Sequence, residues 1–128
     1  MQCIVPCYNK CYICSMNLEN TKSQMRKGIL EFCILSILAH GDAYANELLQ
    51  KLKASRLIVV EGTLYPLLTR LKNMGLLQYR WEESMSGPPR KYYSLTPKGH
   101  DLRAELSQTW EELAGAVAQI QQINTQKI

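Results

Sequence analysis

The sequence predicts a mostly α-helical fold with one small β-hairpin and a long C-terminal helix. Apolar residues recur at helical spacing in three segments between Met25 and Asn73. Two alternating segments then flank a turn cluster that ends in Gly-Pro-Pro, as the strands of a hairpin do. The last 30 residues repeat apolar side chains near a 3.5-residue spacing, which is typical of a helix that pairs with a partner.

Size and composition agree with one globular domain. The chain has 128 residues, of which 46% are hydrophobic and 20% charged, and a net charge of +4. Residues 61–98 carry a net +3 and residues 99–128 a net −2, so a basic middle precedes an acidic end. This gradient favours a polyanionic partner for the middle. No apolar run has the length of a membrane span and no secretory leader is recognisable, so we expect a cytoplasmic protein.

The first two helices are expected over residues 25–39 and from Tyr44 to about Ser55. The first is apolar nearly all round and ends at His40-Gly41-Asp42, which indicates more than one buried neighbour. In the second, Leu48, Leu49 and Leu52 point inward. Residues 56–60 connect it to a third helix that begins at Glu61 and ends at Gly75.

The hairpin is expected from residues 76–82 and 90–95, with a turn at residues 84–89. Thr96 and Pro97 then begin a last helix that runs to about Ile123. Three helices, a hairpin and a long helix form, in this order, a winged helix-turn-helix with a C-terminal dimerisation helix. We therefore divide the chain into an extension (1–24), a winged-helix DNA-binding domain (25–98) and a dimerisation helix (99–128).

The third helix is the predicted DNA-reading element. Leu64, Leu67, Leu68 and Leu71 make its buried side, and the opposite side is small, polar and basic, which suits a DNA major groove. The alternatives are that Tyr65 is a core or packing residue and that Arg70 is only a solvated charge. The candidate DNA contacts on this helix are Gly62, Thr63, Tyr65, Pro66, Thr69 and Arg70.

The hairpin supplies two further candidates, Arg90 and Lys91. Adjacent strand residues point to opposite faces, so we expect one to touch phosphate and the other to pair with Glu82 or Glu83 across the hairpin. Ion pairing of both is the alternative. Arg26 and Lys27 are secondary phosphate candidates.

Several motifs, in order, resemble the signature of PadR-type transcriptional regulators. They are Glu61-Gly62-Thr63-Leu64-Tyr65-Pro66, Arg70-Leu71, Gly75-Leu76, Trp81, Gly87-Pro88, Arg90-Lys91-Tyr92-Tyr93, Leu95-Thr96 and Gly99. The resemblance covers residues 25 to about 123 and implies a homodimeric bacterial repressor. It departs from the family at Val60, where a small polar capping residue is common, and in the cysteine-bearing extension, which has no counterpart.

A homodimer would read a pseudo-palindromic operator in double-stranded DNA. The expected dimer contacts of the last helix are Leu102, Leu106, Leu113, Val117 and Ile120. The resemblance to ligand-responsive relatives also implies a small aromatic effector near Trp110. The simpler alternative is that Trp110 packs the dimer contact.

The sequence offers little support for metal binding or catalysis. Cys3, Cys7, Cys11 and Cys14 lie on one short segment, whereas zinc ligands usually come in two separated pairs. We therefore expect an unstructured extension, or a native start at Met16 or Met25, with no metal or other cofactor. No catalytic constellation is visible, so an enzyme is not expected. The rival functions are a protein-interaction module of the same fold and a redox- or metal-gated regulator that uses these cysteines.

Overall fold

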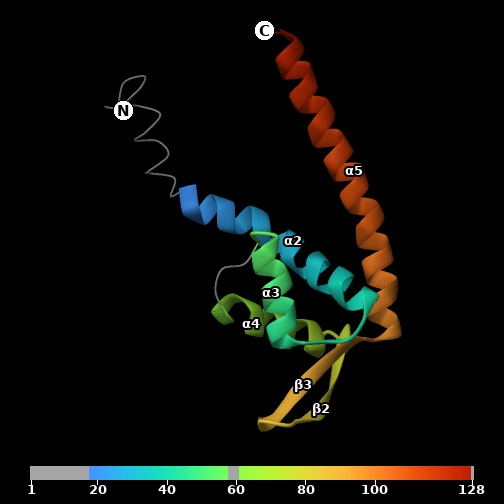
Figure 1. Cartoon of the computed structure of the whole chain (residues 1–128). Helices are drawn as coiled ribbons and strands as arrows, with labels where there is room; N and C mark the ends of the chain where they lie inside the picture. The colour runs from blue at the N-terminus through green and yellow to red at the C-terminus, as the bar shows by residue number, and fades with distance from the viewer. Residues whose placement is uncertain (1–17, 58–60, 128) are drawn as a thin grey trace. The chain divides into compact units, whose positions relative to one another are not determined.

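The computed structural model describes residues 18–57 and 61–127 (Figure 1). The chain divides into two compact units, Met1–Glu31 and Phe32–Ile128, and the second contains every element apart from the first part of α2. The elements, in order, are α2 (Leu18–His40), β1 (Ala43–Tyr44), α3 (Ala45–Ala54), α4 (Glu61–Asn73), β2 (Leu77–Ser84), β3 (Gly87–Leu95) and α5 (Pro97–Lys127).

Helix α2 begins at Leu18, earlier than the predicted Met25. Residues 18–24 show no apolar period, so periodicity does not predict a helix there. They also contain no proline or glycine, so nothing in them interrupts a helix that continues into Met25. The helix ends as predicted, where the backbone N–H of Gly41 donates to the carbonyl of Leu38 at 3.2 Å. The expectations for the four N-terminal cysteines and for Val60 lie outside the described residues.

The core of the second unit is built mainly from aliphatic side chains of three helices, and the sheet and the turn before it add Ala43, Leu76, Leu77, Tyr93 and Leu95. Helices α3 and α4 bury their leucines on one side, at the spacing that the sequence indicated. A truncation of such a leucine to alanine typically costs about 2–5 kcal/mol, so these leucines fix the orientation of both helices. The buried helical residues are Ile34, Leu35, Leu38, Leu48, Leu49, Leu52, Leu64, Leu67, Leu68 and Leu71.

The sheet has three antiparallel strands in the order β1-β3-β2, so β3 is central. The short strand β1 was not predicted, because two residues carry no alternation. The turn is also shorter than predicted, since Pro88 and Pro89 belong to β3. Prolines are tolerated here because the ladder is irregular between Glu82 and Ser84 and β1 covers only residues 92–93 of β3.

Helix α4 ends in a left-handed turn on which the start of α5 rests. Gly75 has φ of +78°, and the N–H of Leu76 donates to the carbonyl of Leu71 at 3.0 Å. The hydroxyl of Thr96 donates to the carbonyl of Gly75 at 2.7 Å and accepts the N–H of Gly99 at 3.0 Å. Gly99 is so close to the carbonyl of Leu76 that a Cβ atom would overlap this oxygen. The start of α5 therefore packs directly against the backbone that follows α4.

Helix α5 continues past the predicted Ile123 to Lys127. It extends away from the sheet, so that its C-terminal end lies far from the hairpin turn (Figure 1). None of the helices in the described part of the chain is both long and apolar enough to cross a membrane.

Candidate nucleic-acid interface

The front of α4 is open to solvent because its leucine side is anchored in the core. All six predicted contact residues of this helix are exposed, and nothing lies within 4 Å of a Cβ atom placed on Gly62. Tyr65 is 47% exposed, so the alternative of a core tyrosine is wrong. Pro66 lies inside the helix without ending it, and Gly62, four residues earlier, has no side chain to add to the crowding that the proline ring causes. The face is hollowed between Tyr65, Pro66, Thr69, Arg70, Asn73 and Met74.

Arg90 and Lys91 lie on opposite faces of the hairpin, as predicted, and each cation is placed over aromatic rings. The Nζ atom of Lys91 is 4.5 Å from the ring centre of Tyr79 and 5.5 Å from that of Trp81. The guanidinium of Arg90 is 4.4 Å from the ring centre of Tyr44. Ring faces attract and orient a cation while they leave its N–H groups available to an anion. Both residues therefore present oriented positive charge beside α4.

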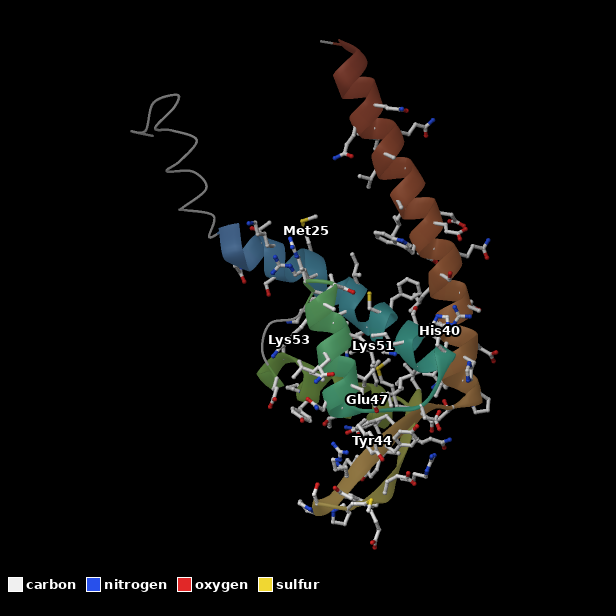
Figure 2. All side chains as sticks on the ribbon, in the orientation of Figure 1. Met25, His40, Tyr44, Glu47, Lys51 and Lys53 are labelled. Atoms are coloured by element: carbon white, nitrogen blue, oxygen red, sulfur yellow. The ribbon has the colours of Figure 1, made fainter. Side chains whose placement is uncertain are left out.

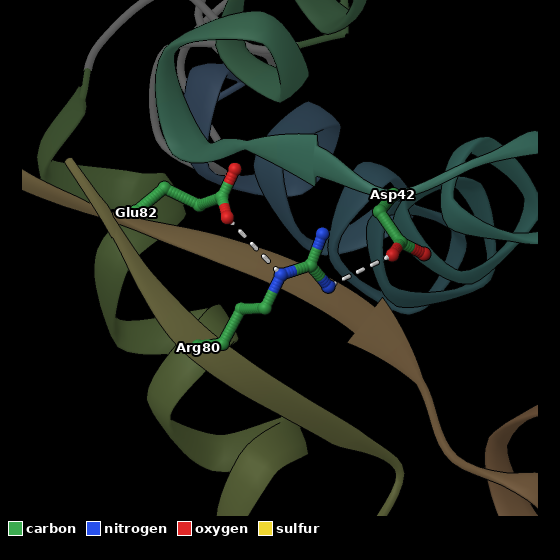
Figure 3. A network of polar contacts seen from close by, with 3 residues as sticks. All are labelled: Asp42, Arg80 and Glu82. Atoms are coloured by element: carbon green, nitrogen blue, oxygen red, sulfur yellow. Dashed lines mark hydrogen bonds and ion pairs between the residues drawn. The ribbon is translucent and has the colours of Figure 1, made fainter. Parts of the chain in front are cut away.

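The predicted cross-strand ion pair is wrong. Arg90 faces Glu82 in the strand register, but the Glu82 carboxylate takes a different arginine, Arg80, at 3.4 Å. Arg80 also reaches Asp42 at 3.3 Å (Figure 3). Its guanidinium lies 4.5 Å from the ring centre of Tyr92. Arg80 lies two residues from Glu82 on the same face of β2, and it already has an aromatic ring beneath it. It therefore reaches the carboxylate while Arg90 stays on Tyr44.

Sequence reasoning did not identify Arg80 as part of the site. Desolvation lowers the pKa of this guanidinium, but the hydrogen bonds to Asp42 and Glu82 outweigh it and raise the pKa above its ordinary value. The residue is thus a permanent cation that bridges two carboxylates near the hairpin. The alternation of side chains along β2 predicts the face on which Arg80 lies, but its partner Asp42 is 38 residues away in sequence. Only the fold brings the two together.

The start of α3 closes the other side of this surface. The backbone N–H of Tyr44 donates to a carboxylate oxygen of Glu47 at 3.0 Å, which caps the helix. Tyr44 and Glu47 lie at the hairpin end of α3, whereas Lys51 and Lys53 follow further along it (Figure 2). The ring of Tyr44 is 4.6 Å from that of Tyr92. The helix start, the sheet and the cations thus form one continuous surface.

The candidate residues of α5 lie in the same unit but away from this surface. Leu102 and Leu106 are half-buried. Trp110 is 44% exposed, and Leu113, Val117 and Ile120 are between 54% and 59% exposed. Residues 106, 110, 113, 117 and 120 follow the alternating four- and three-residue steps of a coiled-coil seam. The chain therefore exposes an apolar seam along the second half of α5.

No group of three metal-ligating side chains is arranged around a common point among the residues that the structure describes. Cys33 is half-buried in α2, and burial raises the pKa of its thiol.

A three-helix core, an exposed small-residue helix face and a cationic hairpin beside it define a winged helix-turn-helix protein of the DNA-binding class. Comparison with known proteins identifies the family. The chain belongs to the PadR-like family of transcriptional regulators, whose family model matches residues 34–105. It is therefore a DNA-binding transcriptional regulator and not an enzyme.

Solved structures of regulators support this assignment. A PadR-like transcription factor from Bacteroides fragilis is 61% identical, with a TM-score of 0.67 over 79% of this chain and 98% of that one. A PadR-like regulator from Bacillus cereus is 39% identical, with a TM-score of 0.68 over 76% and 95% of the two chains. A PadR family regulator from Eggerthella lenta is 33% identical, with a TM-score of 0.69 over 88% and 95%.

Proposed function

We propose that this protein is a cytoplasmic, homodimeric repressor that binds a pseudo-palindromic operator and is released from it by a small aromatic effector. The observation that carries the proposal is the outward face of α4. Its leucines are buried to 8% exposure or less, so its opposite side must face away from the core. That side is narrow and free of acidic side chains after Glu61, which suits insertion into a major groove.

The contacts divide into base-reading and positioning groups. Thr63, Thr69 and Arg70 offer hydrogen-bonding groups to base edges or phosphates from α4. Gly62 and Pro66 keep the front of the helix narrow, and the hydroxyl of Tyr65 extends from its flank. Arg90 and Lys91 bind phosphates from the hairpin, because cations over ring faces still offer their N–H groups.

Dimerisation follows from the seam on α5. Trp110, Leu113, Val117 and Ile120 are all large and exposed, and they share one helix side at coiled-coil spacing. Antiparallel or parallel pairing with a second copy would remove them from water. A pair of reading helices is also needed for useful specificity, because one small module makes too few base contacts. Leu102 and Leu106 extend this contact toward the winged helix.

The effector part of the proposal rests on Trp110, which offers an aromatic surface within the seam. With Trp81 replaced by phenylalanine to remove its signal, planar aromatic compounds should quench the fluorescence of Trp110 and lower operator affinity relative to the same variant without compound. Absence of quenching by every compound tried would leave Trp110 with a packing role. The alternative of a protein-interaction module is less favoured, because the outward face of α4 is neither acidic nor strongly apolar.

The test is selection of bound duplexes from random DNA, followed by affinity measurements on the selected sequence. Replacement of Arg70 by alanine should weaken operator binding about tenfold or more, the usual worth of a charged base or phosphate contact. A matched control is Lys51→Ala, since Lys51 is an exposed cation of α3 that lines neither hollow of the surface. Equal affinities of wild type, both variants and a scrambled duplex would contradict sequence-specific binding.

A further inference from the structure

A cleft of about 310 Å³ lies between α4, the start of α3 and the hairpin. Tyr65 of α4 and Trp81 of β2 form aromatic walls, and Tyr93 of β3 completes them. Arg90 and Lys91 line the same cleft, and no acidic side chain does. None of the functions above uses Trp81, which is 61% exposed.

We propose that this cleft holds the sugar–phosphate backbone of one DNA strand, and that Trp81 is a DNA-contact residue. The inference rests on the proposed function and adds to it the part of the duplex that this cleft recognises. Trp81 and Tyr65 pack against deoxyribose, and Lys91 and Arg90 bind the phosphates that flank it.

The position of the cleft follows from the two DNA-contacting elements. In the proposed binding mode α4 enters the major groove, and Arg90 and Lys91 of the hairpin bind phosphates at the border of the adjacent minor groove. One sugar–phosphate strand separates these two grooves everywhere along B-form DNA. The space between α4 and the hairpin must therefore receive that strand if both elements contact the duplex together. This space is the cleft between Tyr65 and Trp81.

The chemistry of the cleft matches this occupant. A DNA backbone alternates an apolar sugar with an anionic phosphate, and the cleft alternates aromatic rings with cations. Lys91 lies directly opposite Trp81 in the strand register, with its Nζ atom 5.5 Å from the indole ring centre. Tyr79, at 4.5 Å, and Trp81 together orient the cation, and Trp81 borders the position of the adjoining sugar.

The nearby carboxylates are held away from an incoming phosphate. Asp42 and Glu82 both pair with Arg80, and Glu47 accepts the N–H of Tyr44. Arg80 offsets one of the two charges that it contacts, and none of these three carboxylates lines the cleft. An anionic strand meets net positive charge at this point, which the cleft's own residues supply.

The experiment combines protein variants with duplexes that carry one neutral methylphosphonate at each backbone position in turn. The selected operator is used, and affinity is measured for wild type, Trp81→Ala, Trp81→Phe and Lys91→Met. Trp81→Ala should weaken binding about tenfold, the usual order for loss of an aromatic contact to nucleic acid. Trp81→Phe, which keeps an aromatic wall, should recover most of that loss.

Coupling between the protein variants and the methylphosphonate substitutions shows whether Trp81 and Lys91 contact the DNA backbone. One phosphate, or two neighbouring ones, should lose most of their methylphosphonate effect in Lys91→Met and in Trp81→Ala, because the same contact is then already missing. Met85→Ala is the matched control, since Met85 is a fully exposed apolar residue of the hairpin turn outside the cleft. Its effect should add to that of every methylphosphonate.

Two results would overturn the inference while the proposed function stands. The first is wild-type operator affinity in Trp81→Ala, with Arg70→Ala still impaired. The second is coupling of Trp81 to an abasic substitution and to no phosphate, which would mean that the indole stacks on a base. Failure of the proposed function is a different outcome, because the wild type would then select no sequence.

Discussion

Arg80 and Asp42 join the hairpin to the connection between α2 and α3, with the Nη1 and Oδ2 atoms 3.3 Å apart (Figure 3). The contact closes a loop of 38 residues at the edge of the candidate interface. Beside it, the ring centres of Tyr44 and Tyr92 lie 4.6 Å apart, with the ring planes tilted by 53°. The orientation of the hairpin relative to α3 therefore depends on both an ion pair and an aromatic pair.

The ion pair itself should contribute little to global stability. The side chains of Arg80 and Asp42 are 53% and 36% exposed, so water screens their attraction. A double-mutant cycle with Arg80→Ala and Asp42→Ala, followed by urea unfolding, should give a coupling free energy below about 1 kcal/mol, and less at high salt. A salt-independent coupling above about 2 kcal/mol would instead indicate a desolvated pair.

Gly99→Ala should destabilise the fold far more than an ordinary helix substitution. A Cβ atom at this position would overlap the backbone carbonyl oxygen of Leu76, which cannot move without disturbing the end of α4. In an ordinary helix position, alanine is more favourable than glycine by about 1 kcal/mol. Helix propensity alone would therefore predict a stabilising change, whereas we expect a destabilising one. Gly115→Ala is the matched control, because nothing lies within 4 Å of that position. Thermal unfolding should show a lower Tm for the first variant and an equal or higher Tm for the second.

The sequence predicted those parts of the fold that depend on local periodicity. The spacing of Leu64, Leu67, Leu68 and Leu71 gave both the existence of α4 and its buried side, because the same residues that form the helix also bury it. Gly75 and Thr96 marked helix boundaries by their backbone chemistry. These predictions required no knowledge of distant contacts.

Contacts between distant segments were not predictable in this way. Strand β1 exists only because Ala43 and Tyr44 pair with Tyr93 and Tyr92, fifty or so residues later. Glu82 pairs with Arg80 and not with Arg90 because of where the rings of Tyr92 and Tyr44 lie. The alternation of side chains along a strand does not predict those ring positions. The cleft beside Trp81 likewise combines three elements, so a motif in any one of them could not reveal it.

The seam of α5 gives a prediction about oligomeric state. Val117 is 54% exposed in the single chain, and an aspartate there would place a charge inside the expected dimer contact. Val117→Asp should shift the protein to a monomer at micromolar concentration in light-scattering measurements, and operator affinity should fall with it. Gln119→Asp adds the same charge to another side of the helix and should remain dimeric. Equal masses for the two variants would exclude this seam as the interface.

Salt dependence separates a phosphate contact from a base contact. Lys91→Met removes one cation that is expected to neutralise a phosphate, so the slope of log affinity against log salt should flatten by about one unit per subunit. The loss should be similar on operator and on random duplexes, because phosphates carry no sequence information. Met85→Ala, which removes no charge, should keep the wild-type slope. An unchanged slope for Lys91→Met would place this cation away from phosphate.

Cys33 gives a prediction that depends on pH. Burial raises the pKa of its thiol, so the folded chain holds the proton more strongly than the unfolded chain does. The resulting stabilisation is complete below the unfolded pKa and is lost as pH rises toward the folded pKa. In a variant whose other four cysteines are serine, the unfolding free energy should therefore decline across this window, and Cys33→Ala should remove that decline. Thiol labelling provides a second measure, because only the thiolate reacts. At pH 8 the folded variant should react more slowly than the unfolded one, and a faster reaction would contradict a raised pKa.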